Sequence, residues 1–415
     1  MTRILHVLDH SVPRHSGYSF RSRYIVTIAR RLGFETAVVT SARHDVAGEP
    51  VEVIDGIRHY RTPPPVGALN RLQLKIPFWR ERIMTAAMAR RIETAAREFR
   101  PDVLHAHSPF FNGQAALRVG MRLGIPVVYE IRAFWEDDAV DKGKIPEWGF
   151  VYRQVRRLET EVARAADHLV CICEGLRKDM ADRGIPPEKI TVIKNGADAE
   201  SFVPRPKDPE LVERYGLAGK RVIAFIGSFF HYEGLPELMR AVGRLKARRQ
   251  DFKVLLAGGG EDEPEVRRLV DVLGLAEDVA LCGRVPHEDI QAHYALADLF
   301  IYPRRSKRLT ELVTPLKPLE AMAMEKPVIG SAVGGIRELW EECGVGDLFV
   351  PDDPDALDRA LDRALSRSAA ELAEEGRAGR LAVLTKRDWL NTLEPIRAVY
   401  DALATKFSVL PIGRG

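Results

Sequence analysis

The sequence has little of several features that define particular protein classes. Only four of its 415 residues are cysteine, which argues against the disulfide framework of a small secreted protein. No apolar run approaches the roughly 18–20 residues that a membrane-spanning helix requires. The first ten residues contain one basic side chain and no long apolar stretch, so they are not typical of a signal peptide. We therefore expect a cytoplasmic protein.

Signals for metals and cofactors are also scarce. Cys171 and Cys173 lie two residues apart in an apolar run, where small buried side chains are a better interpretation than metal ligands. The glycine run at 258–260 lacks the GxGxxG spacing of a dinucleotide site. We see no DxD metal motif and no motif for a pyridoxal-phosphate lysine. The sequence predicts neither a metal nor an organic cofactor.

Basic charge is unevenly distributed, although the net charge is only +3. Between Arg71 and Arg100 there are eight Lys and Arg residues against three Glu, interleaved with Trp79 and aliphatic side chains. One interpretation is that residues 63–100 contact an anionic membrane at the inner face of the plasma membrane. The alternative is a helix whose apolar residues pack inward. No nucleic-acid-binding motif accompanies the charge, so nucleic acid is not an expected partner.

The length and the pattern of apolar runs predict two domains. Single hydrophobic cores stop growing at roughly 250–300 residues, and this chain is longer. Short apolar runs alternate with amphipathic stretches, which indicates βαβ units and parallel sheets. A turn at Asn195-Gly196 and three prolines up to Pro209 mark a linker. We predict an α/β protein whose two doubly wound, Rossmann-like domains, 1–200 and 201–385, face each other across a cleft. We expect residues 386–415, with a closing helix over 389–403, to pack back on the first domain.

The strongest local signal is the segment Thr310–Glu338. Two prolines flank a turn that opens a helix, and the free N–H groups at a helix N-terminus attract a diphosphate. Lys317 in this turn would add a charge-assisted contact. Glu320 could accept hydrogen bonds from two vicinal ribose hydroxyls, although favourable placement near a positive helix end is the alternative. The glycine pair at 334–335 would let the backbone approach a ligand closely.

These residues resemble a known family. EAMAMEKPVIGSAVGGIREL, at 320–339, is similar to the C-terminal signature of the retaining GT-B glycosyltransferases of family four. The resemblance extends over nearly the whole chain, since HAHSP at 105–109 resembles the histidine motif of the first domain and KNGADAESFVP at 194–204 the linker. A narrower group, associated with exosortase and exopolysaccharide clusters, is resembled by HVLDHSVPRHSGYSFRSR at 6–23, YEIRAFWEDDAVDKG at 129–143 and VTPLKPLEAM at 313–322. The resemblance implies a nucleotide-sugar donor and a glycan or polyprenyl-linked acceptor.

One departure from the family pattern concerns its pair of glutamates, which are usually separated by seven residues. Counted back from Glu320, the first position holds Leu312, and Glu311 is one residue away. The resemblance implies that Glu311 acts as a catalytic residue through a local bulge, or that Thr314 and the backbone contact the sugar hydroxyls instead. It also places Leu319 in the donor site.

A second departure concerns the cations that hold the diphosphate. The family usually has an Arg and a Lys after the glycine that ends the first strand of the second domain. Here Gly227 is that glycine, and the two positions hold Ser228 and Glu233. We keep Gly227 and Ser228 as donor contacts. The cations available to replace the missing charge are Arg304, Arg305, Lys307, Arg308 and Lys317. Of these we predict that Arg308 and Lys317 supply it.

In the first domain a glycine and a histidine follow predicted strands. Gly17 would let backbone amides reach a phosphate or a sugar. The resemblance gives His107 a catalytic role at the donor sugar, with a packed or capping histidine as the alternative. His105 is expected to point to the other side of the strand and to be structural.

Three charged side chains follow the next predicted strand. Glu130, Arg132 and Glu136 come at the end of an otherwise apolar run, where ligands bind in such sheets. We expect Glu130 and Arg132 to contact the acceptor. A salt-bridged loop is the alternative.

The function that fits these observations is glycosyl transfer with retention. The leaving diphosphate can take the acceptor proton, so the enzyme stabilises the leaving group and positions the reactants. A sugar-nucleotide epimerase would share the architecture. The cations missing at Ser228 and Glu233 also leave open a scaffold that binds a sugar nucleotide without turnover.

Overall fold

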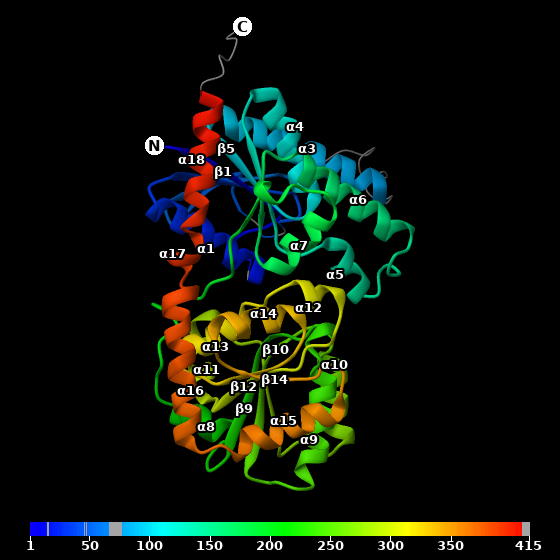
Figure 1. Ribbon diagram of the computed structural model, residues 1–415, viewed down its shortest axis with the longest axis vertical. Helices are drawn as coiled ribbons and strands as arrows, with labels where there is room; N and C mark the ends of the chain where they lie inside the picture. The colour runs from blue at the N-terminus through cyan, green and yellow to red at the C-terminus, as the bar shows by residue number, and fades with distance from the viewer. Residues whose placement is uncertain (15, 45, 47, 66–76, 409–415) are drawn as a thin grey trace. The chain divides into compact units, whose positions relative to one another are not determined.

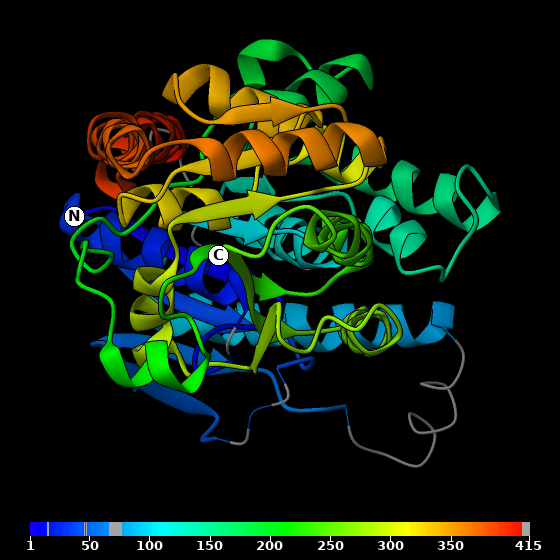
Figure 2. The same ribbon diagram turned by 90° about the horizontal axis from the view of Figure 1, so that it is seen from below.

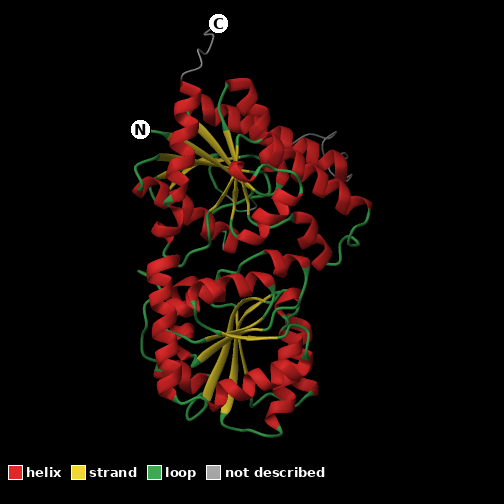
Figure 3. Ribbon diagram, viewed as in Figure 1, coloured by secondary structure: helices red, strands yellow, loops and turns green. Residues whose placement is uncertain are grey.

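The structure is a computed structural model that describes residues 1–408 except 15, 45, 47 and 66–76. The chain divides into two compact units: unit 1 comprises Met1–Lys194 and Thr392–Gly415, and unit 2 comprises Asn195–Asn391. In each unit helices surround a central set of strands (Figures 1 and 3). The predicted boundaries after residues 200 and 385 each lie six residues from these divisions.

Unit 1 is built on an eight-stranded sheet. Its strands follow the order β3-β4-β2-β1-β5-β6-β7-β8, and all neighbours run parallel except the edge strand β3, which is antiparallel to β4. This edge hairpin is an element that the alternation of runs did not predict. The strands are β1 (Arg3–Leu8), β2 (Glu35–Thr40), β3 (Val51–Ile54), β4 (Ile57–Arg61), β5 (Val103–His107), β6 (Val127–Ile131), β7 (His168–Cys171) and β8 (Ile190–Val192).

Helices connect the parallel strands of unit 1. Ser16 caps the first one, because its hydroxyl accepts a hydrogen bond from the Ser19 amide at 3.1 Å. Gly124 ends α4 in a left-handed conformation. The helices are α1 (Gly17–Arg31), α3 (Pro77–Phe99), α4 (Phe110–Leu123), α5 (Trp135–Asp141), α6 (Phe150–Ala165), α7 (Glu174–Asp182), the short η1 (Pro187–Lys189) and α18 (Pro395–Ser408).

Unit 2 is built on a six-stranded parallel sheet in the order β11-β10-β9-β12-β13-β14. Its strands are β9 (Arg221–Ser228), β10 (Phe252–Gly259), β11 (Val279–Gly283), β12 (Leu299–Tyr302), β13 (Val328–Ser331) and β14 (Asp347–Phe349). Its helices are α8 (Pro209–Arg214), η2 (His231–Glu233), α9 (Leu235–Lys246), α10 (Glu263–Val272), η3 (His287–Asp289), α11 (Ile290–Leu296), α12 (Arg308–Leu312), α13 (Lys317–Ala323), α14 (Gly334–Cys343), α15 (Pro354–Ser366), α16 (Ala369–Ala382) and η4 (Val383–Arg387), while α17 (Trp389–Leu393) spans the division between the units.

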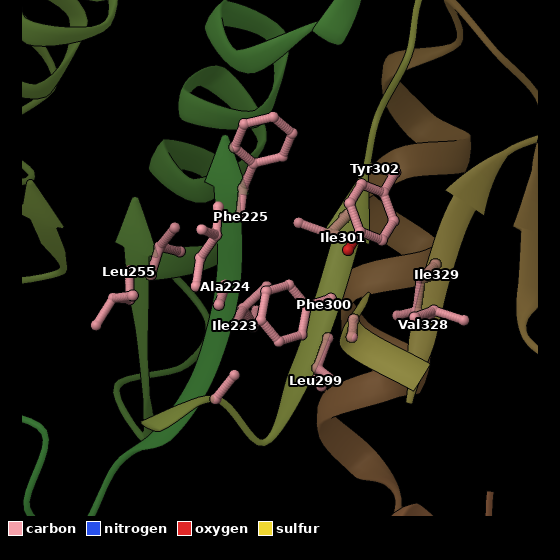
Figure 4. Close-up of a cluster of buried hydrophobic side chains, with 14 of the residues drawn as sticks. Ile223, Ala224, Phe225, Leu255, Leu299, Phe300, Ile301, Tyr302, Val328 and Ile329 are labelled. Carbon is pink, nitrogen blue, oxygen red and sulfur yellow. The ribbon is translucent and has the colours of Figure 1, made fainter. Parts of the chain in front are cut away.

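The core of unit 2 explains why the sequences of its strands are continuous apolar runs. Side chains from both faces of the sheet are buried, as a parallel sheet covered by helices on both sides requires. Figure 4 shows part of this core, where Phe225 of β9, Phe300 of β12 and Ile329 of β13 lie on neighbouring strands. Ligand-binding groups must therefore come from the strand ends and the loops that follow them.

The closing segment differs from the single helix predicted over residues 389–403. The structure has two helices, because α17 ends at Leu393 and α18 begins at Pro395. Proline has no N–H to continue a helix but fits the first position of a new one. Helix α18 packs against the sheet of unit 1, where the Tyr400 hydroxyl lies 2.6 Å from Nδ1 of His105 on β5.

No described helix is both long enough and apolar enough to cross a membrane. Of the basic segment 63–100, residues 66–76 lie outside the described part of the chain. Helix α3 packs Met88, Ile92 and Ala95 into the core. Trp79, at the start of α3, is 46% exposed.

Candidate functional site

In unit 2 the predicted donor residues meet at the carboxyl end of β9. Gly227 has a φ of +144°, and a β-carbon at this position would lie 2.3 Å from Cε of Lys317. The glycine is needed because the Lys317 side chain crosses the strand end at this point. The Lys317 ammonium lies 3.4 Å from the carbonyl oxygen of Ser228, which is exposed. The structure thus brings three predicted residues together.

A buried glutamate holds this lysine. Glu233, in the 3-10 turn η2 after β9, accepts a hydrogen bond from Lys317 Nζ at 2.6 Å and two from Arg304 at 3.2 Å. Glu233 is 1% exposed. Burial by itself raises the pKa of Glu233, but Arg304 and Lys317 outweigh that effect and hold it at about 2. The Glu233 carboxylate is therefore ionised at neutral pH and fixes both cations.

The second cation of this group is Arg304 and not the predicted Arg308. Arg304 comes two residues after β12, at the carboxyl end of the sheet, so its guanidinium reaches the Glu233 carboxylate. Arg308 already belongs to the next element, as the first residue of α12. Sequence reasoning named Arg304 among the available cations but could not tell which of them lies beside Lys317.

Glu320 lies on α13, one turn after Lys317. Its carboxylate accepts a hydrogen bond from the Tyr294 hydroxyl at 2.6 Å, and burial raises its pKa to about 7. Leu319 does not fit its predicted role. Its side chain is fully buried in the core, and its amide donates to the Leu316 carbonyl. The prediction of a ligand contact by Leu319 is therefore corrected, because neither its side chain nor its amide is free for one.

Glu311 lies on α12, and its carboxylate reaches the start of α14, the helix that follows β13. Its carboxylate accepts hydrogen bonds from the Gly334 amide at 2.7 Å and from the Ser306 hydroxyl at 2.6 Å. A β-carbon on Gly334 would lie 2.2 Å from the Glu311 carbonyl oxygen. The glycine therefore allows close packing of α14 on α12, and the approach of a ligand to the glycine pair stays a prediction. The catalytic role of Glu311 stays a prediction.

Thr314 is almost fully buried between α12 and α13. It is 2% exposed, and its carbonyl oxygen accepts a hydrogen bond from the Asn195 side chain at 2.9 Å. Its hydroxyl oxygen has no hydrogen-bond partner among the described residues. A contact from Thr314 to a sugar stays a prediction.

In unit 1 three histidines form one buried cluster. His105 and His107 are two residues apart on β5, and alternate residues of a strand share a face. The expectation that His105 points away is therefore wrong: the two rings lie 4.1 Å apart, and the ring of His6 on β1 lies 5.4 Å from that of His107. All three side chains are fully buried.

The hydrogen bonds of the cluster fix where its protons lie. Arg132 Nη2 lies 2.7 Å from Nδ1 of His107, and a guanidinium can only donate. Neutral His107 therefore carries its proton on Nε2, 3.1 Å from Nδ1 of His6. Nε2 of His6 then carries a proton and has no hydrogen-bond partner among the described residues. Burial lowers the pKa of His107 to about 3, so the ring is neutral at physiological pH.

The cluster has the spacing of a metal site but not its electrostatics. One ligand nitrogen from each of the three rings lies within 4.8 Å of the others. However, the Arg132 guanidinium donates a hydrogen bond to His107 Nδ1, so this nitrogen is not available to a metal. The two positive charges of Arg132 and Arg21 also exceed the single negative charge of Glu130. Repulsion by this positive charge means that the residues present do not fit a resident divalent ion.

Glu130 and Arg132 take part in a closed network, which corrects their prediction as acceptor contacts. Glu130 is 1% exposed and pairs with Arg21 at 3.1 Å and Arg132 at 2.7 Å. Arg132 also donates to the Tyr18 carbonyl at 2.9 Å, near the start of α1. These groups therefore hold the first turn of α1, and Gly17 in that turn is exposed. Glu136, also buried, pairs with Arg183 at 3.2 Å.

Comparison with known proteins identifies the family of this chain. Residues 16–196 match the model of the glycosyl transferase 4-like domain, and residues 208–379 match that of the glycosyl transferases group 1.

Two curated relatives align with most of the chain. A GDP-mannose-dependent alpha-mannosyltransferase from Mycolicibacterium smegmatis is 25% identical over 98% of this chain and 99% of the relative. A D-inositol 3-phosphate glycosyltransferase from Kineococcus radiotolerans is 29% identical over 86% of this chain and 85% of the relative.

The fold is that of solved GT-B enzymes. Anabaena HepE in complex with UDP and glucose superposes with a TM-score of 0.73 at 17% identity, covering 97% of this chain and 100% of the other. Because the two family models together match most of the chain, it belongs to the group 1 glycosyltransferases, family four, and is a glycosyltransferase with the GT-B fold.

Proposed function

We propose that the chain transfers a glycosyl group from a nucleoside-diphosphate sugar to a glycan or polyprenyl-linked acceptor, with retention and without a metal ion or cofactor. The observation that carries this proposal is Lys317, a partly exposed cation fixed beside Gly227 at the carboxyl end of β9. Curated relatives named for GDP-mannose and a solved neighbour with bound UDP support a nucleoside diphosphate as the leaving group.

The chemistry assigned to unit 2 is stabilisation of this leaving group. Negative charge develops on the diphosphate as the glycosidic bond breaks, and the Lys317 ammonium is held ready to meet it. Arg304 adds a second positive charge and, through Glu233, fixes the position of Lys317. Because the ion pairs exist before the donor binds, little reorganisation is needed during the reaction.

Glu320 is assigned to the donor ribose. An ionised carboxylate accepts hydrogen bonds and donates none, so two vicinal hydroxyls can both donate to it. The Tyr294 hydroxyl already donates to one Glu320 oxygen at 2.6 Å and so orients the group. With a pKa of about 7, Glu320 is ionised in only part of the molecules at neutral pH.

For unit 1 we assign positioning rather than contact to the buried groups. His107, Glu130 and Arg132 hold the start of α1, where exposed Gly17 offers its backbone to a ligand. Retention then follows if the leaving diphosphate takes the acceptor proton on the same face, so that no protein nucleophile is needed. We assign the product to surface or exopolysaccharide synthesis at the cytoplasmic side of the membrane.

Two linked measurements test the proposal. A thermal-shift panel of GDP- and UDP-sugars should raise the melting temperature with the true donor, since a ligand that binds the native state stabilises it. The same donor, mixed with a lipid-linked or glycan acceptor, should yield free nucleoside diphosphate and a new glycoside. Binding of a donor without any release of nucleotide from folded protein would instead favour a non-catalytic scaffold. Conversion of the donor without a glycoside would favour an epimerase.

A further inference from the structure

Exposed apolar side chains occur at the end of the connection between α5 and α6 and in the first turn of α6 in unit 1. Trp148 is 45% exposed, Phe150 77% and Val151 48%. We call these three residues the apolar patch. Exposed apolar residues are normally scattered singly over a soluble protein, and a cluster marks a contact surface. In two perpendicular views this helical hairpin projects at one edge of unit 1 (Figures 1 and 2).

The apolar patch is held in a defined conformation. The Trp148 ring packs on the Tyr152 ring, with centroids 4.9 Å apart, and the Arg156 guanidinium lies 5.4 Å from the Trp148 centroid. Tyr152 is in turn fixed by a hydrogen bond from its hydroxyl to Asp137 at 2.7 Å. The indole is thus supported by the protein, although Trp148 stays 45% exposed. A preformed patch loses little conformational freedom on binding.

The surroundings of the patch are basic. Between Lys142 and Arg157 the sequence has five Lys and Arg residues and a single acidic one, Glu147, and three of the five cations pair with acidic side chains outside this segment. Lys144 and Arg153 are exposed on either side of the patch, and neither makes a salt bridge within the described part of the chain. Free cations beside exposed aromatic and aliphatic side chains are complementary to a surface with apolar depth and negative charge.

We propose that the apolar patch docks into the interfacial region of an anionic lipid bilayer, with Lys144 and Arg153 on the headgroup phosphates. Tryptophan favours this region because its ring is apolar and its N–H is polar. The start of α3 lies toward the same edge of unit 1 (Figures 1 and 2). It carries Trp79, which is 46% exposed and has the Arg82 guanidinium 5.8 Å from its ring centroid. The membrane contact predicted for residues 63–100 is thereby assigned mainly to a different segment, and this assignment does not depend on the donor chemistry.

Vesicle sedimentation with the full-length protein tests this proposal. Phosphatidylcholine vesicles with added phosphatidylglycerol should sediment the protein, and pure phosphatidylcholine vesicles should not. The double variant Phe150→Ser/Val151→Ser should bind the anionic vesicles about tenfold more weakly. Lys144→Glu/Arg153→Glu should also weaken binding, and added salt should reproduce its effect.

The matched control is Met121→Ser, because Met121 on α4 is 87% exposed in the same unit but lies outside the patch. It should bind as the wild type does. Failure of the wild type to bind anionic vesicles, equal binding to both vesicle types, or an undiminished double variant would overturn the proposal. So would a dimer, seen by sedimentation velocity without lipid, that the double variant abolishes, since a second copy would then be the occupant. Thermal melting establishes that each variant is folded.

Discussion

Each unit holds a buried glutamate between two cations near the carboxyl ends of its strands, but the two arrangements differ in what they leave open. In unit 1, Glu130 pairs with Arg21 and Arg132, which are 2% and 8% exposed. In unit 2, Glu233 pairs with Arg304, 8% exposed, and with Lys317, whose side chain is 20% exposed. The first network is closed on itself, and the second leaves one cation partly open to solvent.

The shared part of the two arrangements is electrostatic. Burial alone would favour the protonated carboxyl group, but the neighbouring cations hold the pKa of Glu130 well below its ordinary value and that of Glu233 at about 2. Both carboxylates are therefore charged and orient their partners. Burial lowers the pKa of Lys317, an effect that Glu233 offsets in part. The same kind of ion pair is thus closed in unit 1, whereas for unit 2 we propose that it serves ligand binding.

Removing the charge of Glu130 or of Glu233 should give the largest difference between the two units in the free energy of unfolding. We expect Glu130→Gln to lower the free energy of unfolding of unit 1 by about 3–5 kcal/mol, because two buried guanidinium groups lose their counterion. Glu233→Gln should cost unit 2 less, about 2–3 kcal/mol, since Lys317 can turn toward water. Hydrogen–deuterium exchange of peptides from β6 and β9 reports each unit separately.

Glu161→Gln is the control for both variants, because it breaks the exposed Arg157–Glu161 pair on α6. It should leave exchange in β6 and β9 unchanged. Equal losses of protection in the two carboxylate variants would mean that the two networks are equally closed, which would contradict the difference between the units.

The pH dependence of donor binding should follow Glu320. Its pKa of about 7 implies that the ionised fraction, and with it the affinity for a nucleoside diphosphate with a free ribose, rises about tenfold between pH 6 and pH 8. The raised pKa also means that folded protein holds this proton more tightly than unfolded protein, so the contribution of Glu320 to stability falls as pH rises toward 7. Calorimetric titration at several pH values measures the first effect. A Glu320→Gln variant that keeps the wild-type pH profile would exclude Glu320 as its source.

The smallest expected effect concerns the closing helix. Tyr400→Phe removes the hydrogen bond to His105 and should lower the stability of unit 1 by about 1 kcal/mol, because the buried imidazole nitrogen loses a partner. Urea denaturation of this variant beside wild type would detect the change. An unaltered midpoint would indicate that the Tyr400–His105 bond does not help to anchor α18.

The sequence was most informative where local rules decide the outcome. Apolar runs and their alternation predicted both sheets, and the linker residues Asn195–Pro209 predicted the division between the units. Gly227 and Ser228 could be placed because they end a predicted strand, and Lys317 because it lies in the turn that opens a helix. Glu311, by contrast, was matched by spacing to the family's glutamate, and spacing does not reveal that its carboxylate accepts from the Gly334 amide.

Other errors arose where tertiary contacts decide. Leu319 was placed in the donor site by its neighbours in the sequence, but its position on α13 turns it into the core. Arg308 was predicted in place of Arg304, because the distance of each from Glu233 depends on where α12 begins. The His105 error was avoidable, since residues two apart on a strand share a face. Glu233 could be noticed in the sequence because it is an acidic residue at a position where the family has a cation. The sequence does not show that its partners are Arg304 and Lys317.

The central claim is that Lys317 is the open cation of the donor site, and calorimetric titration of Lys317→Ala with the nucleoside diphosphate of the donor tests it most directly. Lys178→Ala is the matched control, because Lys178 pairs with Asp182 on α7 and its side chain is 79% exposed. We predict that Lys317→Ala weakens binding at least about tenfold, as expected for loss of a charge-assisted contact to phosphate, and that Lys178→Ala binds as wild type. Wild-type affinity in folded Lys317→Ala would contradict the account.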